Sequence, residues 1–333
     1  MNCTHWTLVI SLFTAFWSFG NAEAQSPILW FDFANQQTEN LGTLGPDYDG
    51  SLEGNASLVS FQTGFALSLD GQDDFLLTGT TPQQDAFNIA NADFTLFARI
   101  QTTNSEPGAN PACGRDIIRK QSTGCSFTYA LNVIRTTGEV RLSLNGGGEC
   151  INVIGCPVND GVPHELVAVR DSGTLSLYVD NVLVGFEALD PGFGDPANAD
   201  LLVIGGRELD ASGSPCAGDD FNGLIDEIRI YASAVHPTTI VTEPFDRGDC
   251  NQDSAYNIAD PIFLLSALFS GGTYPDCEDA CDANDDGALN IADAVYSLTF
   301  LFSAGAAPPS PHQSCGDDPT VDGLCCPEYS PCP

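Results

Sequence analysis

Basic side chains are almost missing from this sequence. Its 333 residues include 10 lysines and arginines against 45 aspartates and glutamates, which gives a formal net charge of −35. Lys120 is the one lysine. The phosphates of nucleic acids and anionic membrane surfaces repel such a chain, so both are excluded as binding partners. The acidity itself indicates a salt-rich habitat, cation binding, or both.

Long apolar runs are also scarce. Thr7–Phe19 is an apolar stretch of 13 residues, too short to span a bilayer comfortably. Ala22–Ala24 follows as a small-x-small cleavage pattern, so residues 1–24 are expected to be an export signal, although Met1–Trp6 lacks lysine and arginine. The alternatives are an uncleaved anchor or a wrongly assigned start. We expect a secreted or cell-surface protein with no membrane span after signal cleavage.

Catalytic signatures are lacking as well. The sequence has four histidines, one of them in the export signal, and no Gly-x-Ser-x-Gly segment. Glycosidases on two-sheet folds carry carboxylates at alternate strand positions, on one face. Asp226 and Glu227 are adjacent, so regular alternation predicts opposite faces, whereas Glu208 and Asp210 lie among glycines typical of a loop. The sequence therefore favours a non-catalytic protein, with a polysaccharide-active enzyme as the alternative.

Cysteines, in contrast, are plentiful. Twelve remain after residues 1–24 are removed, an even number that predicts disulfides in an exported chain. Five precede residue 220 and seven follow residue 249, so complete pairing requires at least one disulfide between the two halves. A free thiol in each half is the alternative. A zinc site competes less well, because the late cysteines are not interleaved with histidine at finger spacing.

Short apolar runs with a period of two follow one another up to about Val241. They predict ten or more short strands joined by Gly, Asn and Asp turns, and hence an all-β, two-sheet sandwich over residues 26–240. The runs are Pro27–Phe33, Phe65–Leu69, Phe75–Thr78, Phe94–Ile100, Arg115–Lys120, Phe127–Arg135, Val140–Leu144, His164–Phe186, Leu201–Ile204 and Leu224–Tyr231.

The ordered set Ala66–Phe75, Asp93–Arg99, His164–Asp180 and Phe221–Tyr231 resembles the LamG-like, concanavalin A-type jelly-roll family. The resemblance implies a jelly-roll sandwich that often binds glycans or proteins, sometimes with a structural Ca²⁺. For such an ion the candidates are Asp70, Asp73 and Asp74, for which a solvated turn is the favoured alternative. We expect Trp30 to pack in the core and consider three tyrosines as ligand contacts: Tyr48, Tyr129 and Tyr178.

The composition changes after residues 241–247, because no lysine or arginine occurs from Gly248 onwards. We interpret residues 241–247 as a linker. Two twelve-residue segments, Asp249–Asp260 and Asp282–Asp293, align 33 residues apart. Both carry Asp, Asn, Asp, Ala, Asn and Asp at positions 1, 3, 5, 7, 9 and 12. The candidate ligands are Asp249, Asn251, Asp253, Ala255, Asn257 and Asp260 in the first, and Asp282, Asn284, Asp286, Ala288, Asn290 and Asp293 in the second.

This spacing fits the coordination of Ca²⁺ by six to eight hard oxygens, with position 7 contributing its backbone carbonyl. The sequence therefore predicts two Ca²⁺ sites. Acidic turns of a linker are the alternative, which two in-phase copies disfavour. Position 6 needs a sharp turn, so Gly287 should suit it better than Ser254. The second loop also has Asp285 where the first has Gln252, and we expect it to bind Ca²⁺ more tightly.

Each loop precedes an apolar run, Ile262–Phe269 or Ala294–Phe302, that predicts a short helix. Pro244 and Pro275 precede the loops, so no entering helix is expected. The duplicate resembles the type I dockerin module over residues 248–303, which implies a small α module of two loop-helix motifs docking onto a cohesin partner. The resemblance maps the docking residues onto Ile258, Ala259, Ile291 and Ala292.

The two modules together predict a secreted, non-catalytic, calcium-binding protein. Its sandwich would bind a glycan or a surface protein, and its dockerin-like module would mediate assembly. The absence of basic residues from the helices leaves two partners open, a cohesin-like protein or the chain's own sandwich. A structural envelope protein is a further alternative. Residues 304–333, rich in proline and cysteine, are interpreted as a disulfide-pinned tail.

Overall fold

The computed structural model describes residues 25–79, 81–105, 114–121, 127–146, 150–193, 200–206, 220–237, 244–320, 322, 324–326 and 329–332. The expected export signal, residues 1–24, lies outside these residues, as do Glu208, Asp210 and residues 241–243 of the expected linker. Among the described residues, no helix is long and apolar enough to cross a membrane.

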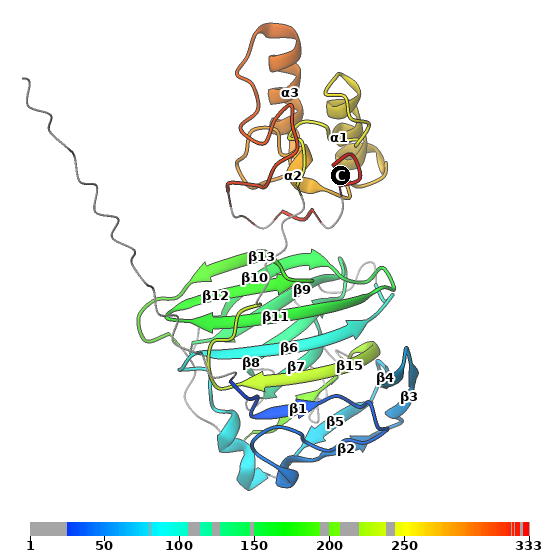
Figure 1. Ribbon diagram of the computed structural model, residues 1–333, viewed down its shortest axis with the longest axis vertical. Coiled ribbons are helices and arrows are strands. Elements are labelled where there is room, and N and C mark those ends of the chain that lie inside the picture. The colour runs from blue at the N-terminus through cyan, green and yellow to red at the C-terminus, as the bar shows by residue number, and fades with distance from the viewer. Residues whose placement is uncertain are drawn as a thin grey trace, which may run out of the picture.

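The predicted β-sandwich is confirmed as two antiparallel sheets (Figure 1). The eight-stranded sheet has the order β13-β12-β11-β6-β15-β4-β3, with β1 paired to β15. Its strands are β1 (Leu29–Phe31), β3 (Ser57–Phe61), β4 (Gly64–Asp70), β6 (Phe94–Gln101), β11 (Pro163–Asp171), β12 (Thr174–Val179), β13 (Val182–Ala188) and β15 (Asn222–Tyr231).

The seven-stranded sheet has the order β10-β9-β8-β7-β14-β5-β2. Its strands are β2 (Gly50–Glu53), β5 (Phe75–Thr78), β7 (Gly114–Gln121), β8 (Phe127–Ile134), β9 (Glu139–Asn145), β10 (Cys150–Pro157) and β14 (Leu202–Ile204). Short 3-10 helices occupy Pro46–Tyr48 and Thr81–Phe87.

Period-two alternation builds the core between the sheets. In β6, Leu96, Ala98 and Ile100 are buried, whereas the side chains of Phe97 and Arg99 point to the outer face and are half-exposed. Such alternation lets one strand supply both the apolar core and a polar outer surface. The outer face of the eight-stranded sheet is therefore available for a site.

In the described part of the chain after the sandwich, the helices are α1 (Ala259–Ser270), α2 (Glu278–Cys281) and α3 (Ile291–Ser303). The predicted helices α1 and α3 are confirmed. Gly271 ends α1 in the left-handed conformation, and Asn290 caps α3 by accepting a hydrogen bond from the Ala292 backbone N–H. The one-turn helix α2 immediately precedes the second loop, so the expectation of no entering helix fails there. Pro275 lies before the turn begins and does not prevent it.

Among the described residues, four disulfides hold this helical part together and join it to the sandwich: Cys250–Cys281, Cys277–Cys326, Cys315–Cys332 and Cys156–Cys325. The last one links β10 to the tail and confirms the expected bridge between the two halves. Cys113, Cys125 and Cys216 lie outside the described residues. In Figure 1 the helices lie on the side of the sandwich where β10 and β13 form the sheet edges.

Candidate functional site

Both loops close around the carboxylate at position 1. In the first loop, Asp249 accepts hydrogen bonds from the backbone N–H groups of Asp253 at 3.0 Å and Ser254 at 2.9 Å. In the second loop, Asp282 accepts them from the equivalent positions 5 and 6, at 3.3 Å and 2.9 Å. The same carboxylate therefore organises the same turn in each copy.

The equivalence continues through positions 3, 5, 7 and 9. The amide N–H of position 3 donates to the carboxylate of position 5, and the amide N–H of position 9 donates to the carbonyl of position 7. The first contact measures 3.0 and 2.7 Å in Asn251–Asp253 and Asn284–Asp286, and the second measures 2.7 Å in both Asn257–Ala255 and Asn290–Ala288. The local hydrogen bonds of positions 3, 5, 7 and 9 are therefore the same in both loops.

Position 12 closes each loop with a buried aspartate. Asp260 and Asp293 accept hydrogen bonds from the backbone N–H of position 9, at 2.7 and 2.9 Å. Burial raises the pKa of Asp260 to about 6 and that of Asp293 to about 7, where the adjacent carboxylate of Asp282 adds to the shift. Oδ1 of Asp293 is buried and has no hydrogen-bond partner. Buried, like-charged carboxylates of this kind require a proton or a cation between them.

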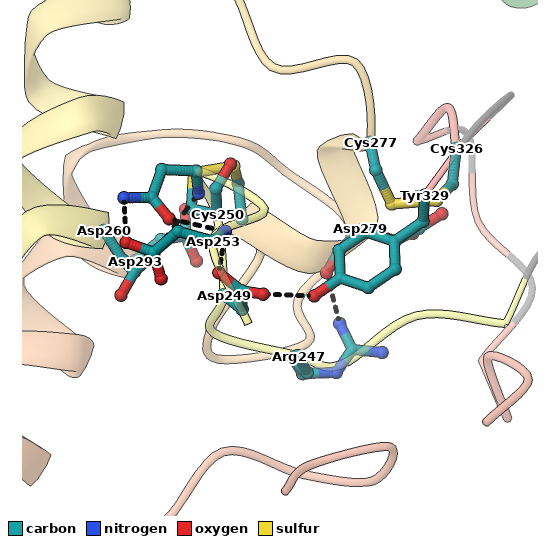
Figure 2. Close-up of a disulfide and its surroundings, with 12 residues drawn as sticks. Arg247, Asp249, Cys250, Asp253, Asp260, Cys277, Asp279, Asp293, Cys326 and Tyr329 are labelled. Carbon is teal, nitrogen blue, oxygen red and sulfur yellow. Dashed lines mark hydrogen bonds between the residues drawn. A yellow bond between two sulfur atoms is a disulfide. The ribbon is translucent and has the colours of Figure 1, made fainter. Parts of the chain in front are cut away.

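The donor set fits Ca²⁺. Each loop gathers three aspartates, two asparagines and one backbone carbonyl, all of them hard oxygen donors of the type that Ca²⁺ prefers. The hydrogen bonds above place the predicted ligands of each loop on one turn, and their binding of Ca²⁺ stays a prediction. Tyr329 of the tail, which the sequence did not single out, joins the first loop by donating its hydroxyl to Oδ2 of Asp249 at 2.6 Å (Figure 2).

Two structural observations bear on the expected difference between the loops, which stays a prediction. Position 6 has a positive φ in both copies, 66° at Ser254 and 73° at Gly287, so the expected strain falls on Ser254. The extra carboxylate of the second loop, Asp285, pairs with Arg247 at 3.0 Å, so its charge is partly offset. Backbone strain is the clearer difference between the two loops.

The helices that leave the loops expose matching rows of apolar side chains. One row comprises Ile258, Ile262 and Phe269, and the other comprises Ile291, Val295 and Phe302, at the same 33-residue offset as the loops. These six side chains are between 49% and 66% exposed. Of the other predicted docking residues, Ala259 is half-buried and Ala292 is exposed. The sandwich of the same chain leaves both rows uncovered.

A second candidate site lies on the outer face of the eight-stranded sheet. The register of β15 against β6 shifts between Ile225 and Glu227, which is a β-bulge. Ile225 and Ile228 both face the core, and Asp226 and Glu227 between them line one pocket. The prediction of opposite faces is therefore wrong, because the extra residue in the bulge interrupts the alternation.

That pocket, with a volume of about 210 Å³, lies among β1, β15, β6 and the β3–β4 hairpin. Trp30 lines it, which corrects the expectation that this side chain packs in the core. Its indole Nε1–H donates to Oε1 of Glu227 at 2.7 Å, and the guanidinium of Arg229 lies 5.3 Å from the indole ring. Arg99 pairs with Asp226. Burial raises the pKa of Asp226, although Arg99 acts in the opposite direction.

The comparisons with known proteins concern the sandwich. Residues 70–241, more than half of the chain, match the Laminin_G_3 family, described as the concanavalin A-like lectin/glucanases superfamily. The chain belongs to this family. The comparison with curated proteins finds no match.

Three solved structures are similar to part of this chain at low identity, each with a TM-score below 0.5. The binding domain of Paraclostridial Mosquitocidal Protein 1 has a TM-score of 0.49 and 11% identity, over 63% of this chain and 50% of that one. Domain 4 of AbnA, a GH43 extracellular arabinanase from Geobacillus stearothermophilus in complex with arabinotriose, has a TM-score of 0.47 and 15% identity. The match covers 65% of this chain and 97% of that one. The Botulinum Neurotoxin DC binding domain in complex with SialylT has a TM-score of 0.46 and 12% identity. The match covers 63% of this chain and 48% of that one. This chain thus spans about half the length of the mosquitocidal-protein and neurotoxin chains.

Other expected positions in the concanavalin A-like domain have structural roles. Tyr129 is buried and donates its hydroxyl to the carbonyl of Phe87 at 3.1 Å, and the Tyr178 hydroxyl contacts His236 at 3.0 Å. Tyr48 is half-buried and packs edge-on against Phe87. None of these three tyrosines lines the Trp30 pocket.

The acidic turn at Asp70–Asp74, where the matched region begins, also has a structural role. Asp70, Asp73 and Asp74 each place one oxygen within 4.8 Å of the others. Asp74 is buried and not solvated, and it accepts hydrogen bonds from the backbone N–H groups of Asn55 and Asp70. These bonds account for its burial without an ion, so a Ca²⁺ in the sandwich stays a prediction.

Proposed function

We propose that the C-terminal part of this chain is a dockerin-like module that binds two Ca²⁺ and attaches the concanavalin A-like domain to a protein partner. The observation that carries the proposal is the duplicate hydrogen-bond network of the loops, which places equivalent oxygen donors in both copies. Without a cation, these clustered carboxylates repel one another. Bound Ca²⁺ would neutralise them and fix the starts of α1 and α3.

The partner is a separate protein with an apolar surface bordered by basic side chains. The two exposed helix rows supply an apolar area on each helix, and the C-terminal part from Gly248 onwards has no lysine or arginine of its own. The sandwich is already present in the structure and does not cover the rows, which argues against docking within the chain. Because the rows are equivalent, either one can present the same surface.

For the sandwich, we propose the binding of a neutral glycan in the Trp30 pocket. An aromatic face beside a few convergent polar groups suits a hydroxylated ligand, and Asp32, Asp226 and Glu227 line the pocket with Arg99. The carboxylates leave no excess of positive charge for an acidic sugar. A larger hollow of about 390 Å³, which includes Gln36 and Asp49, has no aromatic side chain in its lining.

The same pocket argues against the enzyme alternative. Asp226 is paired with Arg99, and Glu227 accepts hydrogen bonds from both Trp30 and Arg229. A glycosidase needs one carboxyl group as a proton donor and a second as a nucleophile or base. Both carboxylates are engaged by neighbouring side chains of the protein, which favours a fixed binding surface over hydrolysis. The disulfides are typical of an oxidising compartment and support export.

Thermal unfolding of the full-length oxidised chain tests the calcium proposal. Millimolar Ca²⁺ should raise the melting temperature of the wild type, because an ion that binds only the folded state stabilises it. The double variant Asp253→Ala/Asp286→Ala should lose most of this increase. Mg²⁺ at the same concentration should have a smaller effect, because it demands a tighter octahedral shell. Equal increases in wild type and double variant would contradict the proposal.

A glycan array tests the sandwich proposal. Trp30→Ala should abolish binding to any neutral glycan that the wild type retains. Phe186→Ala removes an exposed aromatic ring from β13, outside the pocket, and should leave binding unchanged. Binding that survives Trp30→Ala would contradict the assignment of this pocket, and no binding at all would favour the structural envelope role. Release of reducing sugar by the wild type would instead support the enzyme alternative.

A further inference from the structure

A cluster of carboxylates surrounds one buried arginine where the tail folds against α2 and the second loop. Arg247 is fully buried, donates to the carbonyl of Asp282 at 2.9 Å, and pairs with two of these carboxylates, at 3.0 Å and 2.7 Å. The cluster as a whole comprises Asp279, Asp282, Asp285, Asp318 and Asp322. A single guanidinium therefore leaves most of the negative charge unpaired.

Two oxygens of this cluster are buried without any donor. Asp279 lies on α2, is 8% exposed, and its Oδ1 has no hydrogen-bond partner. Oδ2 of Asp322, in the tail, is buried and has no hydrogen-bond partner either. A buried carboxylate oxygen without a donor is unfavourable unless a cation or a proton compensates it. The pair therefore marks a position where a cation would be stabilised.

The spacing of the oxygens fits a metal ion. Asp279, Asp318 and Asp322 each place one carboxylate oxygen within 4.8 Å of the other two. Ca²⁺ binds oxygens at roughly 2.3–2.6 Å, so two ligands on one ion lie at most about 5 Å apart. We propose that Asp279, Asp318 and Asp322 form a third cation site, for Ca²⁺, which adjoins the second loop through Asp322 and is completed by water.

The position of the site suggests what it does. Asp279 belongs to α2, beside the Cys277–Cys326 disulfide (Figure 2), whereas Asp318 and Asp322 belong to the tail. Cys325 follows Asp322 by three residues and carries the disulfide to Cys156 in β10. A cation here holds the tail against α2 just before the tail reaches the sandwich, so it stiffens the connection between the two parts of the protein.

Ion counting by equilibrium dialysis of the full-length oxidised chain tests the site. The wild type should retain three Ca²⁺, and Asp279→Asn should retain two. Asp276→Asn makes the same charge change at an exposed position of the same segment and should retain three. The loop variant Asp253→Ala/Asp286→Ala should retain one ion, which Asp279→Asn then removes. This last pair separates the third site from the two loops, even if the loops bind nothing.

Thermal unfolding provides a second readout that does not depend on counting. With EGTA present, Asp279→Asn should melt higher than the wild type, because the substitution removes an uncompensated buried charge. With Ca²⁺ present, it should gain less in melting temperature than the wild type gains. An Asp279→Asn variant that keeps the wild-type ion count, or equal gains in melting temperature from Ca²⁺ in the two proteins, would overturn the proposal.

Discussion

Position 6 of the first loop offers a direct test of how backbone strain acts in this module. Ser254 has a φ of 66°, in the left-handed region where a Cβ is unfavourable by roughly 1 kcal/mol. Ser254→Gly should relieve this strain. If the first loop becomes ordered only when Ca²⁺ binds, the gain appears as an affinity about five-fold tighter, because 1.4 kcal/mol corresponds to a factor of ten.

The disulfide partner of the first loop changes that outcome. Cys250, at position 2, is joined to Cys281, which directly precedes the second loop, so the oxidised chain holds the first loop in place before an ion arrives. The cost of the positive φ at Ser254 is then part of the free energy of folding and not of the free energy of Ca²⁺ binding. In the oxidised protein we therefore expect Ser254→Gly to raise the free energy of unfolding by about 1 kcal/mol and to change the Ca²⁺ affinity little.

Urea unfolding with EGTA and calorimetric Ca²⁺ titration, both in an Asp286→Ala background, separate the two outcomes. The reciprocal change Gly287→Ser is the matched control in an Asp253→Ala background, and it should be destabilising. A Cβ at Gly287 would also approach Cβ of Asp322 to 3.2 Å. If Ser254→Gly alters neither the unfolding free energy nor the affinity, position 6 does not control this module and the reasoning is refuted.

Further predictions concern the helix rows, the interdomain disulfide and the sandwich. With a purified partner in hand, Ile258→Asp or Ile291→Asp alone should leave a pull-down intact, and the double variant should abolish it; loss with one change would exclude two interchangeable faces. Cys156→Ser should lower the unfolding free energy by roughly 2–5 kcal/mol in urea titrations while Ca²⁺ binding persists. Burial acts to lower the pKa of His164, but hydrogen bonds to two aspartates outweigh it and raise the pKa. The resulting stabilisation should be full below pH 6.5 and be lost as the pH rises through the raised pKa, and a His164→Gln variant should lack this dependence.

Alternation predicted the inner strands well because both of their neighbours are strands and one face is buried. The structure adds β2, β3 and β10, which the sequence did not reveal. All three form sheet edges, and neither β2 nor β3 has a fully buried residue. An edge strand has one neighbour and tolerates polar side chains on both faces, so its pattern is weak.

The loops could be predicted because their ligands are local in sequence, within twelve residues each. The pocket could not, because it depends on long-range pairing. The bulge at Asp226 appears only when β15 is aligned with β6, and Trp30 reaches Glu227 across 197 residues of sequence. The contacts of the tail could not be predicted either. Tyr329 reaches Asp249, and Asp322 lies beside Asp282, only after the chain folds back.

The central claim is that the two repeated loops are Ca²⁺ sites, and comparison of ion stoichiometry among loop variants tests it most directly. Calorimetric titration of the full-length oxidised chain gives the number of ions bound. Asp253→Ala and Asp286→Ala should each bind one ion fewer than the wild type, and the double variant should bind two fewer. A double variant that binds as many ions as the wild type would contradict the account.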